Sequence, residues 1–174
     1  MRERLKEALS RRQKGPCLGA GGSPVPAAVL LPLFRKGDSY HLLFTRRTQE
    51  VEHHKGQISF PGGARHPEDD SLEATALRES WEEIGLESRD VDILGELDDL
   101  VTHTNFQVRP FVALIPHPYS FKPSPVEVEE IIEVPLSALL DENNVREEPR
   151  PGGGTGYFFE YDGHVIWGAT AHIL

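Results

Sequence analysis

The sequence predicts an α/β fold in which a mixed β-sheet is flanked by helices. Segments with strand character outnumber segments with helical periodicity, and the two kinds do not alternate strictly along the chain. The length of 174 residues suits one domain of ordinary size with a substantial core. We therefore expect an N-terminal helix and Gly/Pro linker at residues 1–26, followed by one domain at residues 27–174.

Local patterns place the individual elements. Residues 1–14 carry a narrow apolar stripe that is typical of a helix, and the glycines and prolines of residues 15–26 end it. Asp162-Gly163 predicts a hairpin turn between two strands. Strands are expected at residues 27–34, 40–45, 57–60, 92–100, 108–115, 130–134, 157–161 and 164–167. The other expected elements are helices at 71–84, 135–140 and from 168 onward, and loops at 61–70 and 149–156.

Composition argues against several classes of protein. The formal net charge of −10 disfavours a nucleic-acid partner held by a broad basic surface. No apolar run approaches the roughly 20 residues that span a membrane, and residues 1–15 lack the apolar stretch of a signal peptide. Cys17 is the only cysteine, which rules out an internal disulfide and a multi-thiolate metal site. We therefore expect a cytoplasmic enzyme with no membrane partner, while composition favours neither a monomer nor an oligomer.

The helix at residues 71–84 is the clearest in the chain and has two distinct sides. Asp70 or Ser71 is placed to cap its start, and Gly85 is placed to end it. One side carries an apolar stripe that is predicted to pack on the sheet, formed by Ala74, Leu77, Trp81 and Ile84. The other side carries three carboxylates, those of Glu79, Glu82 and Glu83.

These glutamates break the rules for a stable helix. Glu79 and Glu83 are like charges four residues apart, which costs roughly 0.2–0.5 kcal/mol when they are exposed. Glu82 and Glu83 also lie at the negative end of the helix dipole. Local rules that are broken together mark functional sites, and clustered carboxylates are the ligands that Mg²⁺ or Mn²⁺ requires. A solvated acidic face is the alternative, but the Gly62-Gly63 pair just upstream favours a site, because bare backbone can approach an ion or phosphate closely.

Together these residues resemble the Nudix box, GX5EX7REUXEEXGU, in which U is a bulky aliphatic residue. The second half stands here as Arg78-Glu79-Ser80-Trp81-Glu82-Glu83-Ile84-Gly85-Leu86, with Ser80 in an aliphatic position. The spacing before it slips by one residue, so the acidic position is Asp69 when counted from Gly63 and Asp70 when counted back from Arg78. The resemblance implies a Nudix-type α/β/α sandwich in which one of these aspartates pairs with Arg78.

A second pattern is similar to that of the coenzyme A pyrophosphatase branch of this family, LLTxR(S/A)xxxRxxxGxxxFPGG. Its parts here are Leu43-Phe44-Thr45-Arg46-Arg47-Thr48, Gly56-Gln57-Ile58-Ser59-Phe60-Pro61-Gly62-Gly63 and, near the C-terminus, Ile166-Trp167-Gly168-Ala169-Thr170-Ala171. Thr48 replaces a Ser or Ala of the pattern, and Glu52 replaces a second arginine. This resemblance implies hydrolysis of coenzyme A, or of its thioester or disulfide, to 3′,5′-ADP and 4′-phosphopantetheine or its acylated form.

The resemblance also implies roles for particular residues. Arg78 would hold the loop against the helix rather than touch the substrate. Arg46 and Arg47 are candidates for a phosphate contact, with Arg47 favoured over a simple surface role. The implied Mg²⁺ or Mn²⁺ ligands are Glu79, Glu82, Glu83 and the carbonyl of Gly63, beside Gly62. The basic stretch His53-His54-Lys55 could meet the 3′-phosphate of coenzyme A, although an ordinary surface loop explains it equally well.

The general base stays open among three candidates. Glu130 belongs to an acidic cluster with Glu127 and Glu129 just before a predicted strand. Glu79 and His103 are the alternatives, although a single loop histidine is more often structural. Clustered carboxylates at a strand end can also be merely solvated.

Other functions are compatible with parts of the sequence. A Nudix hydrolase could act on ADP-ribose, NADH or a dinucleotide polyphosphate instead. A nucleotide-binding regulator without catalysis is less well supported, because all three glutamates of the box are present. A purely structural acidic domain leaves the Phe60-Pro61-Gly62-Gly63 segment unexplained. The glycine-rich residues 152–156 lack the lysine of a phosphate-binding P-loop.

Overall fold

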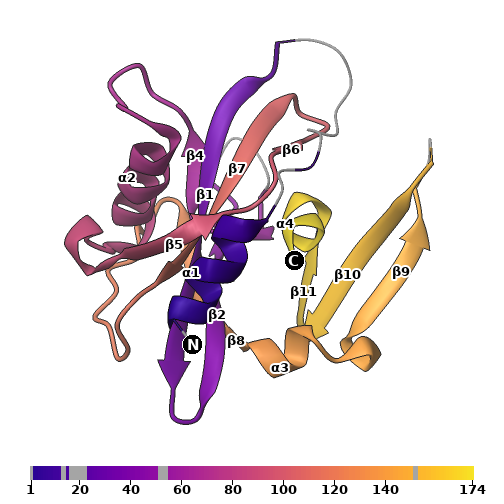
Figure 1. Cartoon of the computed structure of the whole chain (residues 1–174). Coiled ribbons are helices and arrows are strands. Elements are labelled where there is room, and N and C mark those ends of the chain that lie inside the picture. Colours follow the sequence, from indigo (N-terminus) through magenta and orange to yellow (C-terminus); the bar gives the residue numbers. More distant parts are fainter. Residues whose placement is uncertain (1, 13–14, 16–22, 51–54, 151–152) are drawn as a thin grey trace.

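The computed structural model has the expected α/β architecture. A large mixed sheet lies between α2 on one face and a second, smaller sheet with helices on the other (Figure 1). The structure describes residues 2–12, 15, 23–50, 55–150 and 153–174. Within these ranges no helix is both long enough and apolar enough to cross a membrane.

The main sheet has eight strands, and its central path runs β3-β2-β1-β7-β5. At its centre β1 (Val25–Lys36) runs parallel to β7 (Phe106–Leu114), and the other pairings are antiparallel. The remaining strands are β2 (Ser39–Arg47), β3 (Ile58–Ser59), β4 (Gly62–Ala64), β5 (Asp92–Glu96), β6 (Leu100–Val101) and β8 (Val128–Pro135). This arrangement brings the glycine-rich β4 against the central strand of the molecule.

The two faces of the main sheet pack against different elements. Side chains alternate along a strand, so Leu43 of β2 lies in the core under α2 (Leu72–Ile84), whereas Phe44 lies in the core on the opposite face. Arg46 and Arg47, at the end of the same strand, therefore project from opposite faces. A register shift between them, where β2 pairs with β8, is the kind of bulge that re-aims side chains.

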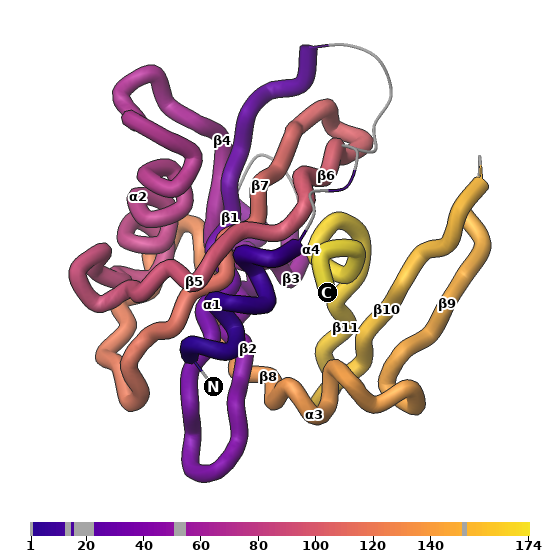
Figure 2. Tube along the Cα trace, viewed as in Figure 1, coloured from indigo at the N-terminus to yellow at the C-terminus, as the bar shows by residue number. Residues whose placement is uncertain are grey.

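The second sheet covers the face opposite α2. It has the order β11-β10-β9, formed by His164–Trp167, Thr155–Tyr161 and Val145–Pro149. The C-terminal helix α4 (Gly168–Ile173) lies between this sheet and the main sheet (Figure 2). The other helices are α1 (Arg2–Arg11), which packs on β5, α3 (Leu136–Leu139), and the short 3-10 turns η1 (Ser88–Asp90) and η2 (Glu142–Asn144).

Two expectations from the sequence need correction. The segment expected as a loop at 61–70 contains β4, because Gly62–Ala64 pairs with residues 27–29 of β1 beyond the point where β2 stops pairing. The expected strand at 92–100 is divided into β5 and β6. In addition, β9 was not anticipated, because its polar residues gave no apolar pattern. Pairing with a neighbouring strand, rather than local composition, creates β4 and β9.

The face that α2 turns to the sheet is also different from the expected one. Trp81 of the apolar stripe is 59% exposed, and Ala74 and Leu77 are only partly buried. The buried positions are instead Thr75, Ala76, Ser80, Glu83 and Ile84. The strands beneath the helix carry Ala28 and the glycines of β4, which admit a close approach by small side chains and by the carboxylates. The helix therefore buries the side that carries its functional groups.

Candidate active site

The helix that carries the three glutamates is capped at both ends as expected. Ser71 is the N-cap, and its hydroxyl accepts a hydrogen bond of 3.0 Å from the backbone N–H of Ala74. Gly85 ends the helix in the left-handed conformation, with φ of 67°, and its N–H donates to the carbonyl of Trp81. The caps fix where α2 begins and ends. They therefore also fix the position along the sheet at which the glutamates of α2 lie.

A buried ion pair between Asp69 and Arg78 joins the loop to the helix. The guanidinium donates from Nε to Oδ1 at 2.9 Å and from Nη2 to Oδ2 at 3.1 Å. Asp69 also accepts from the hydroxyl of Thr75 and from the N–H of His66, each at 2.9 Å. Hydrogen bonding to Arg78 holds the pKa of Asp69 well below its usual range, and the pKa of Arg78 is raised in turn. Of the two aspartates left open by the sequence, Asp69 is the partner.

Glu79 lies directly against the glycine turn. A Cβ on Gly63 would lie 2.6 Å from the Glu79 carboxylate, so only glycine leaves room for this contact. Gly62 has φ of 157°, and a Cβ there would lie 2.3 Å from the carbonyl oxygen of Ala28. Burial raises the pKa of Glu79, and the nearby charges of Glu82 and Glu127 raise it further, although Arg78 opposes this. The turn and the carboxylate together present oxygen atoms of the type that a hard cation binds.

Glu83 is the most deeply buried charged residue among those that the structure describes. It is 2% exposed, and burial raises the pKa of its carboxyl to about 8. Arg47 approaches it at 3.5 Å and the N–H of Gly62 donates to it, yet its Oε2 has no hydrogen-bond partner. A buried, unpartnered carboxylate oxygen is costly unless something else pairs with it, and a divalent cation would do so.

Glu82 is the third glutamate of the helix, and its carboxylate is bonded to Arg78. Arg78 Nη1 donates to Glu79 Oε1 at 2.9 Å and to Glu82 Oε2 at 3.0 Å. Arg78 thus bonds both carboxylates, and in the described part of the chain no three acidic, histidine or cysteine side chains form a group that could hold a metal ion. The donor set nevertheless fits a hard cation, since it consists of carboxylates and a glycine carbonyl close together at one end of α2.

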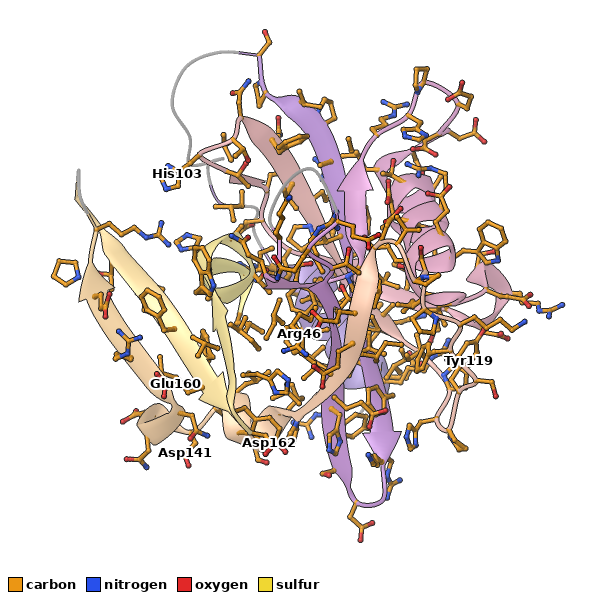
Figure 3. The ribbon with its side chains drawn as sticks, turned by 180° about the vertical axis from the view of Figure 1, so that it is seen from behind. Arg46, His103, Tyr119, Asp141, Glu160 and Asp162 are labelled. Carbon is orange, nitrogen blue, oxygen red and sulfur yellow. The ribbon has the colours of Figure 1, made fainter. Side chains whose placement is uncertain are left out.

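Arg46 and Glu130 lie on the opposite face of the main sheet. They are cross-strand partners, with Arg46 Nη2 2.8 Å from Glu130 Oε2, and the same carboxylate oxygen is 3.2 Å from His164 Nε2. Figure 3 shows Arg46 on the side of the sheet that faces the C-terminal strands. The alternation that directs Arg47 toward Glu83 therefore directs Arg46 and Glu130 away from it, which argues against both as members of the site.

Glu127 is the residue of the acidic cluster whose charge acts on the carboxylates of the helix. Its charge raises the pKa of both Glu79 and Glu83, although burial is the larger cause in each case. Two backbone hydrogen bonds fix its position. The N–H of Thr48 donates to the Glu127 carbonyl at 2.9 Å, and the N–H of Glu127 donates to the Ser124 carbonyl at 3.1 Å. The sequence placed it in a cluster with Glu130, but Glu127 lies in the turn before β8, whereas Glu130 lies within β8 as the cross-strand partner of Arg46.

Two remaining candidates in the described residues, Lys55 and His103, are not brought to the carboxylates. His53 and His54 lie outside the described residues, and Lys55 is exposed in the turn before β3. His103 is exposed in the turn between β6 and β7, at the edge of the molecule (Figure 3). No contact joins Lys55 or His103 to the site in the described structure.

Comparison with known proteins agrees with this geometry. The model of the NUDIX domain matches residues 24–151, well over half of the chain. The chain belongs to the Nudix family. It is 42% identical over 151 residues to "Uncharacterized Nudix hydrolase NudL" of Photorhabdus laumondii, covering 85% of this chain and 80% of that protein. A protein of the same name from Yersinia enterocolitica is 38% identical, with coverages of 85% and 77%.

Solved structures support the same fold. A Nudix hydrolase from Alicyclobacillus acidocaldarius aligns with a TM-score of 0.57 at 22% identity, over 70% of this chain and 83% of that one. The Ap4A hydrolase of C. elegans, in a binary complex, has a TM-score of 0.56 at 18% identity, over 66% and 83%. The NUDIX domain of Shewanella oneidensis NrtR, complexed with ADP ribose, has a TM-score of 0.51 at 18% identity, over 77% and 84%. At these identities the likeness concerns the fold alone.

Asp69 and Asp70 provide a matched test of the loop anchor. We expect Asp69→Asn to lower the free energy of unfolding by about 3 kcal/mol, because it leaves Arg78 without its buried partner. Asp70→Asn, at an exposed position, should stay within about 0.5 kcal/mol of the wild type. Urea denaturation at pH 7 measures both, and equal losses would contradict the assignment. Because the folded pKa of Asp69 is depressed, its contribution is present above its unfolded value near 3.8 and is lost as the pH falls further.

The buried carboxyl of Glu83 predicts the opposite pH dependence. Its folded pKa of about 8 exceeds the usual 4.5, so the folded protein loses stability as the pH rises between these values, on the order of 1 kcal/mol per pH unit. In the presence of a chelator, Glu83→Gln should therefore melt at a higher temperature than the wild type at pH 8 and near the wild type at pH 5. Glu73→Gln, an exposed glutamate of the same helix, should show no such gain. A lower melting temperature for Glu83→Gln at pH 8 would show that its pairing with Arg47 outweighs the cost of burial.

Proposed function

We propose that this Nudix hydrolase cleaves the diphosphate bond of coenzyme A or its derivatives, with Mg²⁺ or Mn²⁺, to 3′,5′-ADP and 4′-phosphopantetheine or its acyl form. The observation that carries the reaction type is the burial of the Glu83 carboxylate and the partial burial of the Glu79 carboxylate beside the Gly62-Gly63 turn. The substrate rests on the sequence pattern that ends in Phe60-Pro61-Gly62-Gly63.

The metal would be held by Glu79, Glu82 and Glu83, with the Gly63 carbonyl as a further ligand. When bound, the cation supplies the positive charge that offsets the diphosphate and lowers the pKa of a water molecule. The bound cation would also explain how a chain with a net charge of −10 accepts an anionic substrate, because the cation attracts the diphosphate locally. Arg78 contributes indirectly, because its bonds to Asp69 and to the carbonyl of Ala64 hold the loop in place.

Two further residues complete the proposed mechanism. Arg47 projects from the end of β2 toward Glu83, where its guanidinium could clamp a phosphate of the substrate. Glu127, whose charge acts on the same carboxylates, is the candidate that we favour as the base that accepts a proton from the attacking water. The assignment of Arg47 follows from its approach to Glu83, and that of Glu127 follows from its charge interaction with Glu79 and Glu83.

Another nucleoside diphosphate derivative is the second candidate substrate. Two structural neighbours carry names that mention Ap4A hydrolase and ADP ribose, and they share the fold with this chain at 18% identity. A binding protein without catalysis is less well supported, because all three glutamates of the box are present and two are buried at the glycine turn. The substrate panel below distinguishes these possibilities.

The first test is a panel of substrates with Mg²⁺ or Mn²⁺, comprising coenzyme A, ADP-ribose, NADH, a diadenosine polyphosphate and dGTP. We expect coenzyme A to yield 3′,5′-ADP and phosphopantetheine, as separated by chromatography. Glu82→Gln should lose more activity than the roughly 10–100-fold that removal of an outer-shell partner costs. Glu73→Gln, exposed on the same helix, should retain it. Cleavage of another compound in preference would replace the substrate assignment, and turnover of none would favour a binding role.

The choice between Glu127 and Glu130 can be tested directly. Glu127→Gln should lower kcat by about 100-fold or more, because it removes the proton acceptor. Glu130→Gln should leave kcat near the wild-type value, since its carboxylate bonds Arg46 and His164 on the other face. The reverse ranking would return the base to Glu130.

A further inference from the structure

The strand that leads into the glycine turn is very short. β3 consists only of Ile58 and Ser59, and it pairs with β2 alone, at the edge of the main sheet path. Phe60 and Pro61 then lead directly to Gly62 and Gly63 of β4. The pairing with β2 continues through the bonds from Arg47 N–H to the Gln57 carbonyl at 3.0 Å and from Gly56 N–H to the Arg47 carbonyl at 3.1 Å, and side chains add further contacts to this short segment.

Two threonine hydroxyls bond the two carbonyls of β3. Thr45 Oγ1 lies 3.4 Å from the carbonyl oxygen of Ser59, within the neighbouring strand. Thr170 Oγ1 donates to the carbonyl oxygen of Ile58 at 3.2 Å, and it comes from α4 at the far end of the chain. Thr170 is only 8% exposed, so this bond is shielded from competing water.

Helix α4 packs on the segment that leads to the glycine turn through a shared core. Ala171 is 3% exposed and belongs to the same cluster as Ile58 and Phe60, together with Phe159 and Ile166 of the second sheet. All of these C-terminal residues lie beyond residue 151, where the match to the family model ends. The C-terminal segment of this chain thus supports the turn from outside the matched domain.

The turn itself has little room to move. Leu30 N–H donates to the carbonyl of Pro61 at 2.8 Å, Gly62 touches the backbone of Ala28, and Gly63 touches the carboxylate of Glu79. A displacement of β3 by a few tenths of an ångström would therefore pass directly to the carbonyl of Gly63. A misplacement of about 1 Å at a site can cost on the order of 100-fold in rate.

We propose that Thr170 is a positioning residue for the metal site, which its hydroxyl supports by fixing Ile58 and, through it, the Gly62-Gly63 turn. The inference rests on the proposed function for the role of the turn, but its contacts are independent of which substrate is cleaved. Thr170 touches neither the substrate nor the reacting atoms in this assignment. Thr170 acts through the backbone of β3, where its hydroxyl bonds the Ile58 carbonyl.

The test compares three single variants of the 174-residue protein. Thr170→Val keeps the shape of the side chain and removes the hydroxyl, whereas Thr170→Ser keeps the hydroxyl. Ala171→Gly weakens the same helix at the neighbouring buried position without touching the bond to Ile58. Melting temperatures identify conditions under which all are folded, and Thr170→Ala replaces the valine variant if that one does not fold.

Three readouts are expected to change together in Thr170→Val. The Kd for Mn²⁺, measured by calorimetric titration, should rise about tenfold. The amides of residues 58–63 should exchange hydrogen about fivefold faster. With the substrate found in the panel, kcat should fall about tenfold while KM stays within about twofold. Thr170→Ser should restore all three, and Ala171→Gly should leave the Kd for Mn²⁺ unchanged.

Other outcomes overturn the proposal in separable ways. Wild-type Mn²⁺ affinity in Thr170→Val, or equal losses in Thr170→Val and Ala171→Gly, would reduce Thr170 to a structural contact. A wild-type protein that binds no Mn²⁺ would overturn both this inference and the proposed metal site. Failure to cleave coenzyme A alone would overturn only the substrate assignment, because Mn²⁺ binding and hydrogen exchange do not depend on it.

Discussion

The close packing of α2 on the glycine turn of β4 is the constraint on which the site depends. Gly63 has no side chain at the point where Glu79 arrives, so the carboxylate lies directly against the turn. The same approach buries Glu83 and raises the pKa of its carboxyl to about 8. In the free protein this arrangement costs stability, and a bound cation is the group that would compensate for it. The helix thus gives up a conventional apolar contact in order to place oxygen ligands.

Several elements far apart in the sequence serve this one contact. Asp69 and Arg78 tie the loop to the helix, and Ser71 and Gly85 set its ends. The carbonyl of Glu83 accepts from the N–H of Ser124 at 2.8 Å, so the segment that carries Glu127 is joined to the end of α2. The described structure therefore couples the box, the end of β2 and the segment before β8 into one rigid unit.

The two faces of the main sheet have different roles. The chemical side is the face under α2, which carries the candidate active site, and the supporting side is the face covered by the second sheet and α4. Arg47 reaches the carboxylates, while Arg46, its neighbour, bonds Glu130 and lies near the C-terminal sheet. The supporting side still reaches the site, because α4 packs behind the strand that leads into the glycine turn. A family-wide domain and a segment beyond the matched residues thus meet at one loop, which is where properties particular to this chain would arise.

Most of the fold and the identity of the box could be predicted from the sequence, because they depend on local patterns. Alternation and turn residues located β1, β2, β7 and the β10–β11 hairpin, and the spacing of Arg78, Glu79, Glu82 and Glu83 indicated the helix and its carboxylates. Only the tertiary structure decided three points: that Asp69 rather than Asp70 pairs with Arg78, that Trp81 is exposed, and that Glu130 lies with Arg46 on the face away from Glu83. Each depends on which side of an element turns toward a distant neighbour. A shift of one residue reverses the face of a strand and turns a helix by 100°, so motif spacing with a one-residue ambiguity leaves such choices to packing.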